Sequence, residues 1–146
     1  MIFPTIKGHE WVIRIGPIPH VRLYLAGPYS SGGGPRNHAV MLRRAIEHAQ
    51  CAGALMLKGH YVFSPVAMHH AIKAVCELPT DWETFWRDRD YDFIQTYADA
   101  LAIFNIPGWH ESEGTLSELV FAVAIGKPVF VVNQDGEAIY ELRKTE

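Results

Sequence analysis

The sequence predicts one α/β domain: a three-layer, Rossmann-like (flavodoxin-like) fold with a four- to five-stranded parallel sheet. Two observations lead to this fold class. Short apolar segments alternate with longer segments of helical spacing, which is typical of parallel strands joined by right-handed helical crossovers. Two of the short segments, Leu101–Phe104 and Val129–Val132, are wholly apolar, as expected of strands that helices cover on both faces.

Turn and capping residues set the limits of the elements. Residues 39–57 repeat apolar side chains at helical spacing, and Thr80-Asp-Trp-Glu83 has the form of a capping box that starts another helix. Ser112 or a neighbour is expected to cap a helix that runs to Gly126. We expect a further helix over Ala67–Cys76, and strands at Leu23–Ala26, Tyr61–Phe63, Leu101–Phe104 and Val129–Val132.

The two ends of the chain lie outside this alternation. We expect residues 1–20 to be an N-terminal extension and residues 21–146 to be the main domain. Within the extension, Trp11–Ile15 is expected to be an edge strand or an oligomer arm. Residues 138–146 are expected to add a fifth strand or a short helix.

Composition narrows the possible partners. The 146 residues are 49% hydrophobic and carry a formal net charge of −3 with mixed signs, which argues against nucleic acid as the main partner. The longest apolar runs are too short for a membrane span, and residues 1–16 lack the pattern of a secretion signal. Cys51 and Cys76 are expected to be buried free thiols, and the histidines show no metal-ligand spacing. We therefore expect a cytoplasmic protein with a small-molecule ligand and no metal or cofactor.

Two loops that leave strand ends could bind a ligand. In parallel sheets, ligands bind beyond the carboxyl ends of the strands. The loop after the first strand offers glycines and hydroxyls to phosphate or sugar oxygens, although a plain turn is an equal alternative. The loop before the last helix offers a helix start, where ordinary N-capping by Ser112 is compatible with ligand binding. The candidate ligand-binding residues are Gly27, Tyr29, Ser30, Ser31, Ser112, Gly114 and Thr115.

Two acidic residues are predicted to point inward. Glu118 is the one ionisable side chain on an otherwise apolar helix, so it should be buried, and buried carboxylates cluster at functional sites. A structural ion pair with an arginine is the alternative. Asp90 falls inside an aromatic stripe on another helix, whereas Asp88 and Asp92 share a face that looks solvated. Two inward carboxylates near strand ends suit the cleavage of a glycosidic bond.

The same residues carry a family resemblance. Tyr24-Leu-Ala-Gly-Pro-Tyr-Ser30, together with Glu113-Gly-Thr-Leu-Ser-Glu118 and Ala124-Ile-Gly-Lys-Pro128, resembles the nucleoside 2-deoxyribosyltransferases and the 2′-deoxynucleoside 5′-monophosphate N-glycosidases. An uncharacterised bacterial and phage branch is more similar still, by Phe63-Ser-Pro-Val-Ala67, Leu78-Pro-Thr-Asp-Trp82, Phe85-Trp86 and Gly108-Trp109. The resemblance implies that Glu118 is the nucleophile, Asp90 its partner and Tyr24 part of the active-site floor. It places Ser112 where the phosphate-specific branch has a serine.

The resemblance implies an enzyme that cleaves or transfers the N-glycosidic bond of a nucleotide or nucleoside. The sequence also departs from the family pattern, because the spacing from Asp90 to Asp99 differs by about one residue. Asp92 therefore stays open as the alternative partner carboxylate. The family often completes its site from a neighbouring subunit, and the apolar helix over Leu116–Ile125 also predicts a homo-oligomer. The alternatives are a non-catalytic nucleotide sensor and a metal-dependent phosphoesterase that uses His69 and His70. Adjacent helical histidines diverge, which makes the phosphoesterase the weakest of the three.

Overall fold

A six-stranded mixed sheet organises the part of the chain that the computed structural model describes, residues 2–30 and 37–146. In sheet order, the strands are β1 (His9–Ile13), β6 (Ala138–Lys144), β5 (Val129–Val132), β4 (Ala100–Phe104), β2 (Arg22–Ala26) and β3 (Tyr61–Phe63). The four strands from β5 to β3 are parallel, as predicted. β6 pairs antiparallel with β5, and β1 antiparallel with β6. The prediction of a purely parallel sheet of four to five strands is therefore wrong at this edge.

A tight turn explains the antiparallel edge. The side chain of Asn133 accepts hydrogen bonds from the backbone N–H groups of Asp135 and Glu137, at 3.1 and 2.9 Å. Gly136 follows with a positive φ of 76°, which glycine adopts without steric cost. The chain therefore reverses directly after β5, and β6 returns beside it as a hairpin. The dipeptide Asp135-Gly136 is a known hairpin signal in a sequence.

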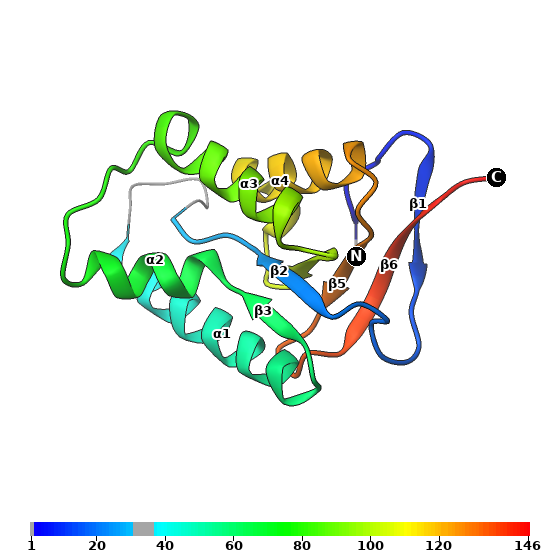
Figure 1. The fold of residues 1–146 in the computed structure, drawn as a ribbon, viewed down its shortest axis with the longest axis horizontal. Coiled ribbons are helices and arrows are strands. Elements are labelled where there is room, and N and C mark those ends of the chain that lie inside the picture. Colours follow the sequence, from blue (N-terminus) through cyan, green and yellow to red (C-terminus); the bar gives the residue numbers. More distant parts are fainter. Residues whose placement is uncertain (1, 31–36) are drawn as a thin grey trace.

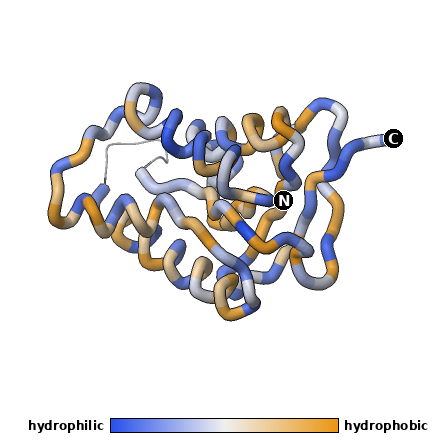
Figure 2. Tube along the Cα trace, viewed as in Figure 1, coloured by the Kyte–Doolittle hydropathy of each residue, from blue (hydrophilic) through white to orange (hydrophobic). Residues whose placement is uncertain are grey.

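Helices cover both faces of the sheet (Figure 1). α1 (His38–Leu57) lies beside α2 (Pro65–Lys73) on one side, and α3 (Arg87–Thr96) and α4 (Glu113–Ala124) lie on the other. Alternate residues of each parallel strand contribute to two separate hydrophobic clusters, one against α1 and one against α3 and α4. The hydrophobic positions run along the central strands in Figure 2. This arrangement delivers the carboxyl ends of β2, β3 and β4 to the loops that carry the candidate site.

The helix after Thr80 begins differently from its prediction. The cap is Asp81, whose carboxylate accepts from the backbone N–H groups of Glu83 and Thr84, at 3.0 and 3.4 Å. A π-helical turn, η1 (Trp82–Trp86), precedes α3. The wider π turn adds room in the backbone spiral, and such turns occur often at functional sites.

The structure also tests the expected burial of the two cysteines. Cys51 is buried in α1 as a free thiol, but Cys76 is exposed because α2 ends earlier, at Lys73. The prediction of a buried Cys76 is therefore wrong. Within residues 2–30 and 37–146, no helix combines the length and the apolar character that crossing a bilayer requires.

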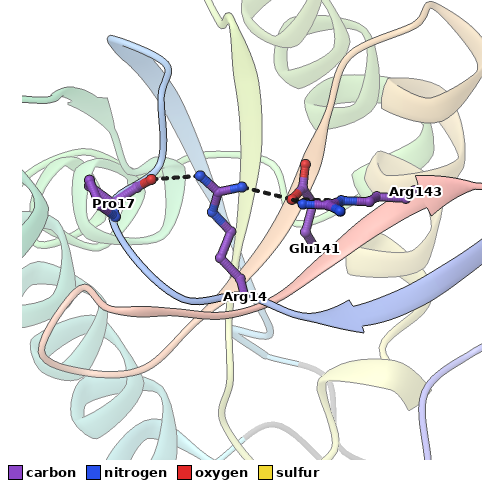
Figure 3. A network of polar contacts seen from close by, with 4 residues as sticks. All are labelled: Arg14, Pro17, Glu141 and Arg143. Atoms are coloured by element: carbon purple, nitrogen blue, oxygen red, sulfur yellow. Dashed lines mark hydrogen bonds and ion pairs between the residues drawn. The ribbon is translucent and has the colours of Figure 1, made fainter.

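A polar network fastens the N-terminal strand to the sheet (Figure 3). Arg14, directly after β1, donates to Glu141 on β6 at 2.8 Å and to the backbone carbonyl of Pro17 at 2.7 Å. Arg143 donates to the same Glu141 carboxylate at 2.9 Å. Burial raises the pKa of Glu141, but the hydrogen bonds from Arg143 and Arg14 outweigh it and hold the pKa below its usual range. Glu141 therefore stays ionised and binds Arg143 on its own strand, β6, and Arg14 directly after the neighbouring strand, β1.

Candidate active site

A cavity of about 990 Å³ opens at the carboxyl ends of β2 and β3 and at the start of α4. Its wall combines the loop after β2, the start of α2, η1, one side of α3 and the first turns of α4. The candidate residues Gly27, Tyr29, Ser30, Asp90, Ser112, Gly114, Thr115 and Glu118 all line it. Ser31, another candidate, lies outside the described residues. Residues from five separate elements thus meet where parallel sheets bind ligands.

Glu118 is buried at the bottom of this cavity. It lies in the second turn of α4 and is only 5% exposed. The hydroxyl of Tyr24, on β2 and fully buried, donates a hydrogen bond to its carboxylate. The salt bridges among the described residues do not include Glu118, so the structure gives no support to a structural ion pair with an arginine. α4 therefore presents one buried acid whose hydrogen bond comes from the strand beneath it.

Asp90 lies on the same cavity from α3. It is 9% exposed, and its carboxyl is hydrogen-bonded to the indole of Trp82 and to Tyr24. Asp88 and Asp92, the neighbouring acids, are both exposed. Asp88 sits at the rim and pairs with Arg87 at 3.6 Å, and Asp92 does not line the cavity. The structure thus brings Asp90, Tyr24 and Glu118 together and leaves Asp92 outside.

The surroundings of Asp90, Tyr24 and Glu118 raise the pKa of all three side chains. Burial raises the pKa of Asp90 to about 7, although the hydrogen bonds from Tyr24 and Trp82 partly oppose it. Burial and the nearby Asp90 charge raise the pKa of Glu118 well above its ordinary value. Burial and the two carboxylates also raise the pKa of Tyr24. The two carboxyls therefore resist joint ionisation, because the charge of one disfavours the charge of the other.

This arrangement carries a cost in stability that a substitution should reveal. An acid with a raised pKa binds its proton more tightly in the folded chain, so its contribution to stability falls as pH rises from about 4 to about 7. We expect Asp90→Asn to raise the free energy of unfolding by about 1–3 kcal/mol at pH 8 and little at pH 4. Urea unfolding of both proteins across this pH range measures the difference. A gap that shrank with rising pH would contradict the assignment of Asp90 as a buried, proton-retaining acid.

The hydroxyl and glycine residues frame the opposite wall. Ser112 caps α4, and its hydroxyl oxygen accepts from the Thr115 backbone N–H at 3.4 Å and from the Thr115 hydroxyl at 3.0 Å. At Gly27 a Cβ would lie 2.5 Å from Cε1 of the buried His48, so a side chain there would collide with α1. Gly114 lies beneath Trp82, whose indole nitrogen would be 3.7 Å from a Cβ at that position. Gly27 thus allows the backbone to lie close to the His48 ring, whereas a Cβ at Gly114 would make ordinary contact with Trp82.

Aromatic residues in the cavity wall were not among the predicted site residues. Trp82 and Trp86 both line the cavity. His69 packs on Trp86 with ring centroids 4.0 Å apart, and the Trp86 indole donates to the Pro79 carbonyl at 2.8 Å. The sequence offered one indication that these two tryptophans belong to the site, because both precede Asp90 on the same helical segment.

The adjacent histidines of α2 are engaged with aromatic side chains. His70 shares a 2.7 Å hydrogen bond with the Tyr29 hydroxyl, while His69 packs on Trp86. Over residues 2–30 and 37–146, no group of three or more histidine, cysteine and acidic side chains is placed to hold a metal ion.

Comparison with known proteins places the chain in a family. Residues 21–134 match the model of a family described as a domain of unknown function, DUF1937. The chain belongs to the DUF1937 family. Among solved structures, this DUF1937 protein is similar to a 2-deoxyribosyltransferase from the psychrotolerant bacterium Bacillus psychrosaccharolyticus. The two share 28% sequence identity with a TM-score of 0.51, over 82% of this chain and 77% of that chain. No curated protein matches the sequence significantly. The family and structure matches confirm the resemblance to the nucleoside 2-deoxyribosyltransferase superfamily.

Proposed function

We propose that the chain is an enzyme that cleaves or transfers the N-glycosidic bond of a (deoxy)nucleoside 5′-monophosphate or nucleoside, with Glu118 as nucleophile. The observation that carries the proposal is the pair of buried carboxyls, Glu118 and Asp90, in one cavity and linked through Tyr24. The similarity to a 2-deoxyribosyltransferase supports an enzyme of the glycosyl-transfer type. An unpaired buried acid costs stability, so its presence at a ligand-sized cavity favours a chemical role.

The proposed reaction has two steps. A carboxylate oxygen of Glu118 forms a bond to the anomeric carbon of the sugar, and the bond from that carbon to the base nitrogen breaks. The electron pair stays on the base nitrogen, which takes up a proton from Asp90. In the second step, water or the N–H nitrogen of another base attacks the anomeric carbon, the bond from that carbon to Glu118 breaks, and the proton of the attacking group passes to Asp90. Water makes the enzyme a hydrolase, and a second base makes it a transferase.

Asp90 suits the proton transfer in these steps. With a pKa of about 7, it holds a proton in a large fraction of molecules at neutral pH, where an acid–base catalyst is most effective. Trp82 donates to Asp90 and so fixes its orientation from the cavity wall. The Tyr24 hydroxyl carries one hydrogen, so it stabilises one of the two carboxylates at a time. Tyr24 thereby couples the charge of the nucleophile to that of its partner.

The two walls of the cavity suit the two ends of a nucleotide. The paired rings of His69 and Trp86 offer a flat surface for the base. Ser112, Thr115 and the start of α4 offer hydroxyls and backbone N–H groups for the 5′ end. The neutral Ser112 itself does not repel a phosphate, although Glu113 beside it lines the same cavity. We therefore favour a monophosphate as substrate over a free nucleoside.

A substrate panel tests this function. The purified protein is incubated with the common deoxyribonucleoside and ribonucleoside 5′-monophosphates and the matching nucleosides, with and without a second free base, and released base is measured by chromatography. We expect base release from at least one monophosphate and kcat/KM about tenfold lower for the matching nucleoside. Equal or better activity on the nucleoside would overturn the phosphate preference. Binding without any base release would support a nucleotide sensor and refute the enzyme.

We also propose that the chain forms a homo-oligomer. On α4, Val120 is 56% exposed and Ile125 36%, and Phe93 on the adjacent α3 is 38% exposed. Apolar side chains on two neighbouring helices suit burial against another subunit. Sedimentation at micromolar concentration should give at least a dimer, and a monodisperse monomer would contradict this proposal.

A further inference from the structure

We propose that the two ends of the chain, which lie outside the matched family region of residues 21–134, hold the Ser112 loop in its ligand-binding position. Phe3 and Trp11 would do this by packing on Trp109, the residue that starts this loop, and Tyr140 would support Phe3. The role of Ser112 in ligand binding rests on the proposed function, whereas its position in the loop does not. Phe3, Trp11 and Tyr140 are thus positioning residues that need not touch the ligand.

Trp109 is the link between the end segments and the cavity. It begins the 3₁₀ turn η2 (Trp109–Glu111), and its side chain is only 1% exposed. The backbone N–H of Ser112 donates to the carbonyl of Trp109 at 3.2 Å. Ser112 then ends η2 and caps α4 within the cavity wall. Any shift of the Trp109 backbone therefore moves the cap of α4.

Two aromatic rings from the N-terminal segment pack on Trp109, and a third ring, Tyr140, packs on one of them. The Phe3 ring lies 5.6 Å from the Trp109 ring, and the Trp11 ring 5.9 Å from it, measured between centroids. Phe3 also packs edge-on against Tyr140 of β6 at 4.7 Å and against Trp11 of β1 at 5.1 Å. The indole nitrogen of Trp109 has no hydrogen-bond partner among the described residues. Packing in its hydrophobic cluster therefore holds this side chain, and the ring separations are typical of aromatic pairs.

These aromatic residues are themselves fixed to the sheet. β1 pairs with β6 over five residues, from His9 opposite Lys144 to Ile13 opposite Tyr140. The Trp11 indole donates to the carbonyl of Pro4 at 3.1 Å, which keeps the first residues folded back over β1. Arg14 and Glu141 join the two strands at their other end (Figure 3). The N-terminal segment is thus an ordered wall that packs on the loop.

The hydrogen-bond partners of the catalytic carboxyls lie outside this wall. Glu118 receives its hydrogen bond from Tyr24 on β2, and Asp90 is held by Trp82 on η1. Loosening Trp109 should therefore weaken ligand binding more than the chemical step. This difference separates a positioning role from a general loss of fold.

Hydrogen exchange followed by mass spectrometry tests the proposal on the unliganded full chain. Phe3→Ala removes the central ring, Phe3→Leu keeps apolar bulk but no ring, and Ile15→Ala alters a 93% exposed side chain nearby as control. We expect exchange over residues 109–116 to be about tenfold faster in Phe3→Ala, less so in Phe3→Leu and unchanged in Ile15→Ala. Exchange in β2 and β4 should stay unchanged. In turnover, KM should rise about tenfold while kcat changes less than about twofold.

Two results would overturn the proposal. One is unchanged exchange over 109–116 in folded Phe3→Ala, and the other is an equal increase across all strands. If Phe3→Ala does not fold, Phe3→Leu decides between the same outcomes. If the protein releases no base from any nucleotide, the proposed function fails, but the exchange result still decides whether the ends of the chain hold this loop.

Discussion

Glu118→Gln is expected to abolish base release, with a fall in kcat of about 10³-fold or more, while the chain remains folded. The amide keeps the shape of the carboxylate and can still accept the hydrogen bond from Tyr24. It lacks the charged oxygen that attacks the anomeric carbon. Chromatography of released base with the best substrate of the panel measures the effect.

The fold of this variant provides its control. Glu118 is buried with a raised pKa, so removing its ionisation should leave the unfolding temperature unchanged or higher. Base release at the wild-type rate would contradict a nucleophilic role for Glu118. Loss of activity together with loss of fold would show only that Glu118 is structural.

Asp90→Asn should lower kcat by about 10²–10³-fold, the range typical of losing an acid–base catalyst. The variant keeps the hydrogen bonds that an amide can make with Tyr24 and Trp82 but no longer exchanges a proton. Because Asp90 titrates near pH 7, its substitution should also remove the change of rate with pH around neutrality.

Asp92→Asn is the matched control, since Asp92 lies two residues further along the same helix and is exposed. We expect its kcat to stay within about twofold of the wild type, as for surface substitutions away from the site. A severe loss in Asp92→Asn with little effect in Asp90→Asn would reverse the assignment of the partner carboxylate.

The parallel core and the two inward-pointing acids could be predicted from the sequence because both follow from local periodicity. The apolar runs of β4 and β5 could only be covered strands, and Glu118 had to be buried because its neighbours on the helix were apolar. For Asp90, the aromatic stripe of α3 distinguished it from Asp88 and Asp92. In each case a repeat within one element already determines which side chains face the core.

What the sequence missed depends on contacts between distant elements. The outermost strand pair, β1 with β6, joins segments that are far apart in the chain, whereas the β5–β6 hairpin follows from the local turn at Asp135-Gly136. The π turn and the start of α4 bring Trp82 and Trp86 into one cavity, which no pattern within a single helix predicts. The packing of Phe3 on Trp109 likewise joins the beginning of the chain to a loop near its end. Periodicity carries no information about such pairs.

Trapping of the glycosyl-enzyme tests the central claim most directly. A reaction of the wild-type protein with its best nucleotide substrate is quenched in acid during the first turnover, digested and analysed by peptide mass spectrometry. We predict that the peptide containing Glu118 gains the mass of the sugar, or of the sugar phosphate, while the base is free. Released base with no sugar on any peptide, or with the sugar on another residue, would contradict the account.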